Sequence, residues 1–278
     1  MNQILIWPHE IEIEIESESE SESERALNQV VIRDSERLAH IDQYLKPSIG
    51  DTLRLAILGE GRVAAAKIVE YDGEKIIFEF RRDEVDDSLP STIFGRNLHL
   101  IVGLSRPPTL KKIFEHATTM GVSAFHLLST SLTEKSYLTS KILNKDEFTR
   151  HLCLGLSQSS LYYNLPTVEI YKNVRDLSRN FRERKSTEKF ILSADASESF
   201  LQLQLQLQLQ LQRQTQISSA LVIAVGPERG FTGEEENFFI QELEFTPVKI
   251  SNSILRVEHA TFHALAQLEM TTMIDNSY

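Results

Sequence analysis

The strongest constraint on the fold is a run of six apolar residues, Ala220 to Val225, that is followed directly by Gly226-Pro227. An uninterrupted apolar run of this length is typical of a strand that is buried on both faces of a parallel sheet. Thr232 and Glu235 then form the capping-box pattern with which helices begin. The stretch therefore predicts a strand, a glycine-containing loop and a helix, the repeating unit of an α/β domain.

The same alternation continues on both sides of this unit. Further strands are predicted at 97–102, 122–128, 167–171, 190–194 and 247–250, and helices at 109–120, 146–156 and 255–273. In open α/β sheets, ligands bind beyond the carboxyl ends of the strands. Gly226 and Gly230 would let a ligand approach the backbone of the loop between them. We therefore expect this loop to form part of a binding site.

A different pattern precedes this domain. Short strands at 52–57, 63–69 and 75–80, separated by glycine-containing turns, predict a small β-barrel. A polar stretch that ends at Pro90 follows, and it indicates a linker. We expect a barrel domain over 1–88, a linker over 89–97 and an α/β domain over 98–278.

Two low-complexity tracts interrupt these domains. Residues 10–25 begin with an Ile-Glu repeat, whose period of two predicts a strand, and continue as a Ser-Glu repeat with nothing apolar to bury. Residues 201–212 are six Leu-Gln repeats, and alternation would place every leucine on one face of a strand. We interpret both tracts as insertions, either loops or hairpin extensions, without a chemical role.

Charge and cysteine content limit the classes of function. The net charge is −11, but residues 10–25 alone contribute −7, from eight glutamates and Arg25. Basic residues gather between 172 and 189, so an anionic partner is not excluded, although a solvated helix face is the commoner meaning of such a cluster. Cys153 is the only cysteine, which excludes an intrachain disulfide and a thiolate metal cluster. No apolar run approaches the ~20 residues of a membrane span, and we expect a soluble, cytoplasmic protein.

Several enzyme classes can be weighed from motifs alone. The sequence lacks the phosphate-binding loop of P-loop enzymes, the third glycine of a dinucleotide fingerprint and the Gly-x-Ser-x-Gly elbow of serine hydrolases. His259 and His263 are four residues apart, a spacing that zinc ligands use on a helix. Position 260 is alanine, so the usual general-base glutamate is missing. A zinc hydrolase is one alternative, and a structural role of the two histidines is the simpler interpretation.

Two motifs carry a family resemblance. Gly226-Pro-Glu-Arg-Gly230 precedes a helix, and Ile254-Leu-Arg-Val-Glu-His-Ala260 follows about 25 residues later. Together with Met120-Gly-Val-Ser123 and Leu165-Pro166, this pattern resembles the RsmE family. Members of that family are SPOUT-class methyltransferases that methylate N3 of a uridine in 16S ribosomal RNA of the small subunit. The resemblance covers nearly the whole chain outside the two tracts.

The resemblance implies a fold and a site that periodicity does not show. It implies a PUA-like RNA-binding barrel, then a SPOUT-type α/β domain with a C-terminal trefoil knot, in a homodimer. S-adenosylmethionine would be the cofactor and no metal would be needed. The implied cofactor-binding residues are Val225, Gly226, Pro227, Glu228, Gly230, Ile250, Ser251, Ile254 and Leu255. The implied catalytic residues are Arg256, which would stabilise charge on the uracil, and Glu258, which would orient Arg256 or serve a structural role.

The predicted function is therefore S-adenosylmethionine-dependent methylation of a uridine N3 in ribosomal RNA, with the small ribosomal subunit as partner and no membrane. The alternative from another class is a non-catalytic or re-targeted RNA- or ribosome-binding protein that retains the methyltransferase fold. Affinity for the cofactor separates the two hypotheses, because a pure binding module has no use for it.

Overall fold

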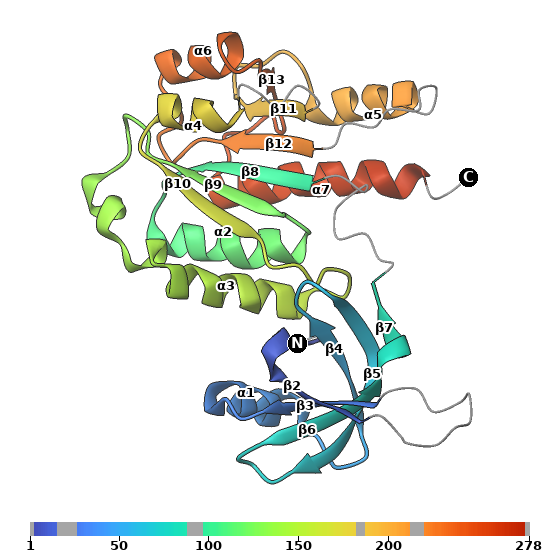
Figure 1. Cartoon of the computed structure of the whole chain (residues 1–278). Helices are drawn as coiled ribbons and strands as arrows, with labels where there is room; N and C mark the ends of the chain where they lie inside the picture. The colour runs from blue at the N-terminus through green and yellow to red at the C-terminus, as the bar shows by residue number, and fades with distance from the viewer. Residues whose placement is uncertain (1–2, 16–26, 88–96, 182–186, 212–219, 276–278) are drawn as a thin grey trace. The chain divides into compact units, whose positions relative to one another are not determined.

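A computed structural model of the chain describes residues 3–15, 27–87, 97–181, 187–211 and 220–275 (Figure 1). The chain divides into two compact units. The first comprises Met1–Ser91 together with Leu156–Leu165, and the second comprises Thr92–Gly155 and Pro166–Tyr278. The boundary near residue 91 lies in the segment predicted as a linker, whereas the return of 156–165 to the first unit was not predicted.

The first unit is built on one seven-stranded sheet. Its strands are β1 (Ile4–Ile6), β2 (Ile11–Ile15), β3 (Leu27–Ile32), β4 (Thr52–Ile57), β5 (Gly61–Tyr71), β6 (Ile76–Arg81) and β7 (Val85–Asp86). Their order is β1-β4-β5-β6-β3-β2, with β7 paired to β5, and only β1–β4 is parallel. The Ile-Glu repeat forms β2 as predicted, and the Ser-Glu repeat lies outside the described residues.

A helix in this unit corrects the prediction of strands alone. α1 (Ser35–Leu45) begins at Asp34, whose carboxylate accepts a hydrogen bond from the Arg37 N–H at 2.7 Å. Leu38 and Ile41 are buried in the same core as Phe78. The capping residue and the apolar spacing of three were visible in the sequence, and they produce an amphipathic helix over the sheet.

The second unit contains a six-stranded sheet in which every pair of strands is parallel. Its strands are β8 (Asn97–Gly103), β9 (Ala124–Leu128), β10 (Thr167–Tyr171), β11 (Thr187–Leu192), β12 (Ala220–Val225) and β13 (Thr246–Val248). Their order is β10-β9-β8-β12-β11-β13. All six residues of β12 are buried between β8 and β11, as the apolar run predicted.

Helices cover both faces of this sheet (Figure 1). They are α2 (Pro107–Thr119), α3 (Lys145–Gln158), α4 (Val174–Phe181), α5 (Phe200–Leu211), α6 (Gly233–Gln241) and α7 (Val257–Asp275). α2 and α7 pack against each other on one face. α4 and α6 cover the other face, where Phe181 and Phe239 join one core with strand residues such as Val222. The second unit is therefore a mixed α/β layer structure.

The Leu-Gln repeat forms a helix rather than the predicted strand or loop. It makes up nearly all of α5, which packs against α7. Leucine and glutamine are both strong helix formers. Phe200 at the first position is fully buried against Phe190, with ring centroids 5.3 Å apart. Intrinsic propensity and this packing outweigh the period of two, and residue 212 lies outside the described residues.

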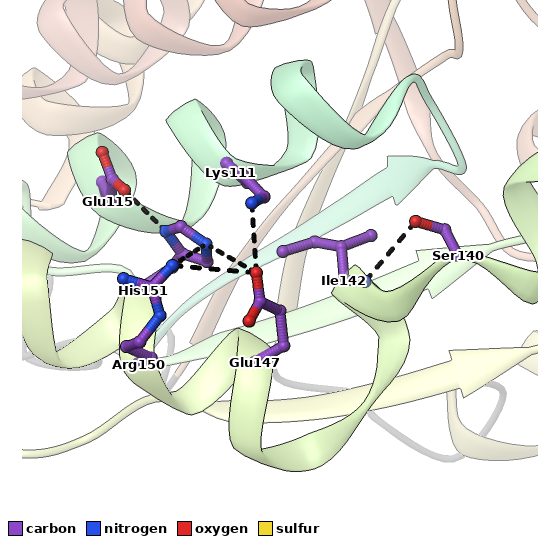
Figure 2. Close-up of polar contacts among 7 residues, drawn as sticks. All are labelled: Lys111, Glu115, Ser140, Ile142, Glu147, Arg150 and His151. Carbon is purple, nitrogen blue, oxygen red and sulfur yellow. Dashed lines mark hydrogen bonds and ion pairs between the residues drawn. The ribbon is translucent and has the colours of Figure 1, made fainter.

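A polar cluster joins α2 to α3 (Figure 2). The buried imidazole of His151 lies 2.6 Å from a Glu115 carboxylate oxygen through Nδ1 and 3.4 Å from Glu147 through Nε2. Lys111 Nζ is 3.1 Å from the same Glu147 oxygen, and Arg150 is 3.7 Å from it. The cluster therefore ties the two helices together through ion pairs and hydrogen bonds.

Candidate active site

A cavity of about 690 Å³ opens in the second unit beside the carboxyl ends of β11, β12 and β13. The loop after β12 and the segment between β13 and α7 form much of its wall. All eleven predicted site residues line it: Val225, Gly226, Pro227, Glu228, Gly230, Ile250, Ser251, Ile254, Leu255, Arg256 and Glu258. The fold thus brings together two motifs that are about 25 residues apart in the sequence.

Close backbone contacts shape the loop after β12. A Cβ atom at Gly226 would lie 3.1 Å from the Gly230 Cα and from the Phe231 nitrogen. A Cβ at Gly103, at the end of β8, would lie 2.3 Å from the Pro227 ring. Only glycine allows backbones to approach so closely. The loop therefore folds back on itself and exposes backbone groups to the cavity.

Two carboxylates hold this loop to the neighbouring strand ends. Glu228 accepts a hydrogen bond from the Arg106 N–H, beyond β8, at 2.8 Å. The buried Glu235 accepts from the Ser131 N–H, beyond β9, at 2.7 Å and from the Thr232 N–H at 2.9 Å. The second contact completes the capping box that the sequence predicted at the start of α6. The loop is thereby preorganised.

The two residues predicted to be catalytic stand at the start of α7. Arg256 is exposed, and no hydrogen bond or ion pair engages its guanidinium group within the described parts of the chain. The Glu258 side chain is only 8% exposed, and its carboxylate lies 3.7 Å from Lys112 Nζ on α2. Among the described residues, no hydrogen bond or ion pair joins Glu258 to the Arg256 guanidinium, so Lys112 is the partner that sequence reasoning missed.

Other cavity residues were also absent from the sequence prediction. Arg106, Asp195 and Lys249 follow β8, β11 and β13 respectively, and all three line the cavity. A hydrogen bond from Arg106 Nε to the Tyr137 hydroxyl, 3.3 Å long, raises the pKa of the Arg106 guanidinium above its usual value. In the sequence, only the positions of these three residues indicate a role, because charged residues just beyond parallel strands lie at the edge of the sheet where ligands bind.

The structure also bears on the zinc alternative. His259 and His263 are both exposed on α7. Across the described ranges, no three His, Cys, Asp or Glu residues gather where they could hold a metal ion.

No described helix has the length and apolar character needed to cross a membrane.

A comparison with known protein families identifies the class of protein to which this chain belongs. A family model described as an RNA methyltransferase domain matches residues 94–269, which include the whole cavity. This part of the chain is an RNA methyltransferase domain.

Two individual relatives identify the family within this class. Ribosomal RNA small subunit methyltransferase E 1 of Borreliella burgdorferi is 30% identical over 228 residues, 82% of this chain and 87% of the relative. Ribosomal RNA small subunit methyltransferase E of Treponema pallidum is 29% identical, over 84% of this chain and 82% of its own length. The chain belongs to the RsmE family, as its two motifs indicated.

A solved structure extends the likeness to the whole fold. The ribosomal RNA small subunit methyltransferase E of Neisseria gonorrhoeae, whose crystal structure is bound to S-adenosyl methionine, matches with a TM-score of 0.70. The match covers 97% of each chain at 18% identity. At that identity the comparison establishes the shared fold.

Proposed function

We propose that this protein transfers a methyl group from S-adenosylmethionine to N3 of a uridine in 16S ribosomal RNA of the small subunit. One observation carries the proposal: both family motifs, at 226–230 and 254–260, meet in one cavity beyond the strand ends. The names of the relatives and the cofactor in the Neisseria structure support it.

The cavity fits this cofactor in size and in chemistry. A volume of about 690 Å³ lies within the range of small-molecule sites. The close approach of Gly226 to Gly230 makes a cradle that a Cβ atom would fill. We infer that Val225 to Gly230 and Ile250 to Leu255 hold the cofactor largely through backbone groups. When bound, S-adenosylmethionine supplies a methyl group on a positively charged sulfur.

The residues at the start of α7 would act on the nucleotide. N3 of neutral uracil carries a proton, which must leave before or during attack on the methyl carbon. Negative charge then develops on the ring. Arg256, an exposed cation that has no ion-pair partner among the described residues, is placed to stabilise it. Glu258, paired with Lys112, would fix the first helical turn from which this region projects. Holding the three reacting atoms in line supplies the remaining catalysis.

The finer assignments of the fold are part of the same proposal. We infer that the first unit is a PUA-like barrel that contacts RNA, and that the C-terminal segment of the second unit forms a trefoil knot. We further infer a homodimer that acts in the cytoplasm on the small ribosomal subunit. The family resemblance supports these assignments, together with the parallel sheet and the two-unit division.

The test is methyl transfer from labelled S-adenosylmethionine to small ribosomal subunits that lack the modification, followed by mass spectrometry of the nucleosides. The expected product is 3-methyluridine. A different methylated nucleoside would contradict the proposed target. Absence of both product and cofactor binding would favour the alternative, a non-catalytic RNA- or ribosome-binding protein.

A further inference from the structure

Lys249 is a cation of the cavity that neither family motif includes. It follows β13 directly, and its neighbours Ile250 and Ser251 belong to the proposed cofactor-binding segment. Its N–H donates to the Glu198 carbonyl at 2.7 Å, and its carbonyl accepts from the Phe200 N–H at 3.0 Å. Both hydrogen bonds fix the main chain, so the side chain starts from a defined position at the cavity wall.

The ammonium group of Lys249 is available to a ligand. The residue is half-buried, and no hydrogen bond or ion pair engages its Nζ within the part of the chain that the structure describes. Lys189 shows the contrasting case, because its Nζ donates to the carbonyl of Leu243 at 3.0 Å. A half-buried lysine without such a partner gains most from an anionic group on a ligand.

Because the cavity is acidic, a negatively charged group of a ligand needs a cation beside it. The cavity is lined by four carboxylates and three cations: Asp195, Glu228, Glu236 and Glu258, against Arg106, Lys249 and Arg256. A carboxylate that enters this acidic site is repelled and partly desolvated unless a positive charge meets it. Ribose hydroxyls and an ammonium group need no such help.

Lys249 is the half-buried cation among these three, since Arg106 and Arg256 are both exposed. Arg106 donates from Nε to the Tyr137 hydroxyl, and Arg256 has the proposed role of stabilising charge on the uracil. We propose that Lys249 binds the methionyl carboxylate of S-adenosylmethionine through a charge-assisted hydrogen bond. This inference rests on the proposed function and adds the group that would select a cofactor carrying the amino-acid carboxylate.

The experiment compares two ligands that differ by this carboxylate alone. S-adenosylmethionine and decarboxylated S-adenosylmethionine are titrated calorimetrically into the full chain, without RNA. Lys249→Met is expected to weaken binding of S-adenosylmethionine about tenfold, as expected for loss of one hydrogen bond between charged groups. Its affinity for the decarboxylated ligand should match that of the wild type, which also shows that the variant is folded.

Two further variants serve as controls. Lys249→Arg keeps the positive charge and should retain most of the affinity for S-adenosylmethionine. Lys67→Met removes an exposed lysine of β5 in the other unit and should change neither affinity. An equal loss of both ligands in Lys249→Met, or no loss of either, would overturn the assignment. A wild-type protein that binds neither ligand would instead refute the proposed function itself.

Discussion

At the scale of single residues, the site depends on a few side chains whose environments differ sharply. Arg256 is exposed and unpaired within the described residues, whereas Glu258 is buried and lies 3.7 Å from Lys112. The basic residues between 172 and 189 likewise include both exposed and buried side chains. Lys172 and Arg175 are exposed, but Lys189 is buried, and burial lowers the pKa of its ammonium group. Spacing in the sequence identifies such residues without revealing which ones face solvent.

Replacing Arg256 tests its role in stabilising charge. Arg256→Ala is expected to reduce kcat by about 10²-fold or more, the usual effect of removing one group that stabilises transition-state charge. Calorimetric affinity for S-adenosylmethionine should remain close to that of the wild type. Arg256→Lys keeps the charge and should recover part of the rate. Equal losses of kcat and cofactor affinity in Arg256→Ala would show a cofactor-binding role instead.

Replacing Gly226 tests the loop geometry. Its Cβ atom would lie 3.1 Å from backbone atoms of the same loop, so Gly226→Val should distort the cradle. We expect affinity for S-adenosylmethionine to fall by at least about tenfold, since several backbone contacts would shift together. Gly233→Ala is the matched control, because a Cβ there meets nothing within 4 Å. Unchanged affinity in Gly226→Val would refute the assignment of this loop to the cofactor.

At the scale of elements, apolar patterns predicted the six strands of the second unit and the helices α2, α3, α6 and α7, whereas α4 was not predicted. β10 and β12 have the predicted bounds, and the other strands differ by a few residues. One failure occurred where pattern and propensity disagree. The Leu-Gln repeat alternates like a strand, yet α5 is a helix that packs against α7. α1 was missed because its amphipathic pattern is short and lies among strands.

Deleting residues 201–212 tests whether this packing stabilises the protein. α5 packs against α7, and none of its described side chains, those of 200–206, lines the cavity. We expect the melting temperature to fall by roughly 3–8 °C, corresponding to a loss of about 2 kcal/mol in a chain of this size. Affinity for S-adenosylmethionine should persist. Deleting 17–24, which contains only serine and glutamate, is the control. An unchanged melting temperature for the first deletion would mean that α5 contributes no net stability.

The polar cluster between α2 and α3 predicts a dependence of stability on pH (Figure 2). A hydrogen bond from Lys111, followed by one from His151, lowers the pKa of Glu147 from its usual 4.5. A lowered pKa in the folded state means that this stabilisation is present above about pH 4.5 and is lost as the pH falls through the folded-state value. Glu147→Gln should therefore lower the melting temperature at pH 7 and have progressively less effect toward pH 3.

Thermal melts across this pH range provide the measurement. Glu36→Gln, at an exposed position near the start of α1, is the matched control and should leave the pH profile unchanged. A constant difference between Glu147→Gln and the wild type at all pH values would contradict the linkage.

At the scale of the whole molecule, the chain returns once from the second unit to the first. Within that unit, Gln3 donates to the carbonyls of Leu156 and Tyr162 at 3.0 and 2.8 Å, and the buried Tyr163 donates to the Asp87 carbonyl at 3.0 Å. A long-range return of this kind leaves no local signature, because its hydrogen-bond partners are more than 70 positions apart. The domain prediction therefore treated the first unit as one continuous segment.

The sequence by itself determined the parallel α/β architecture of the second unit, most of its strands and helices, and the family. Those properties follow from local periodicity, capping residues and two motifs, all of which are visible in the sequence. Only the tertiary structure decided that Lys112 pairs with Glu258, that Lys249 and Asp195 share the cavity, and that the Leu-Gln repeat is helical. The physical reason is that burial and charge pairing depend on neighbours distant in sequence, and such contacts are set when the strands and helices pack.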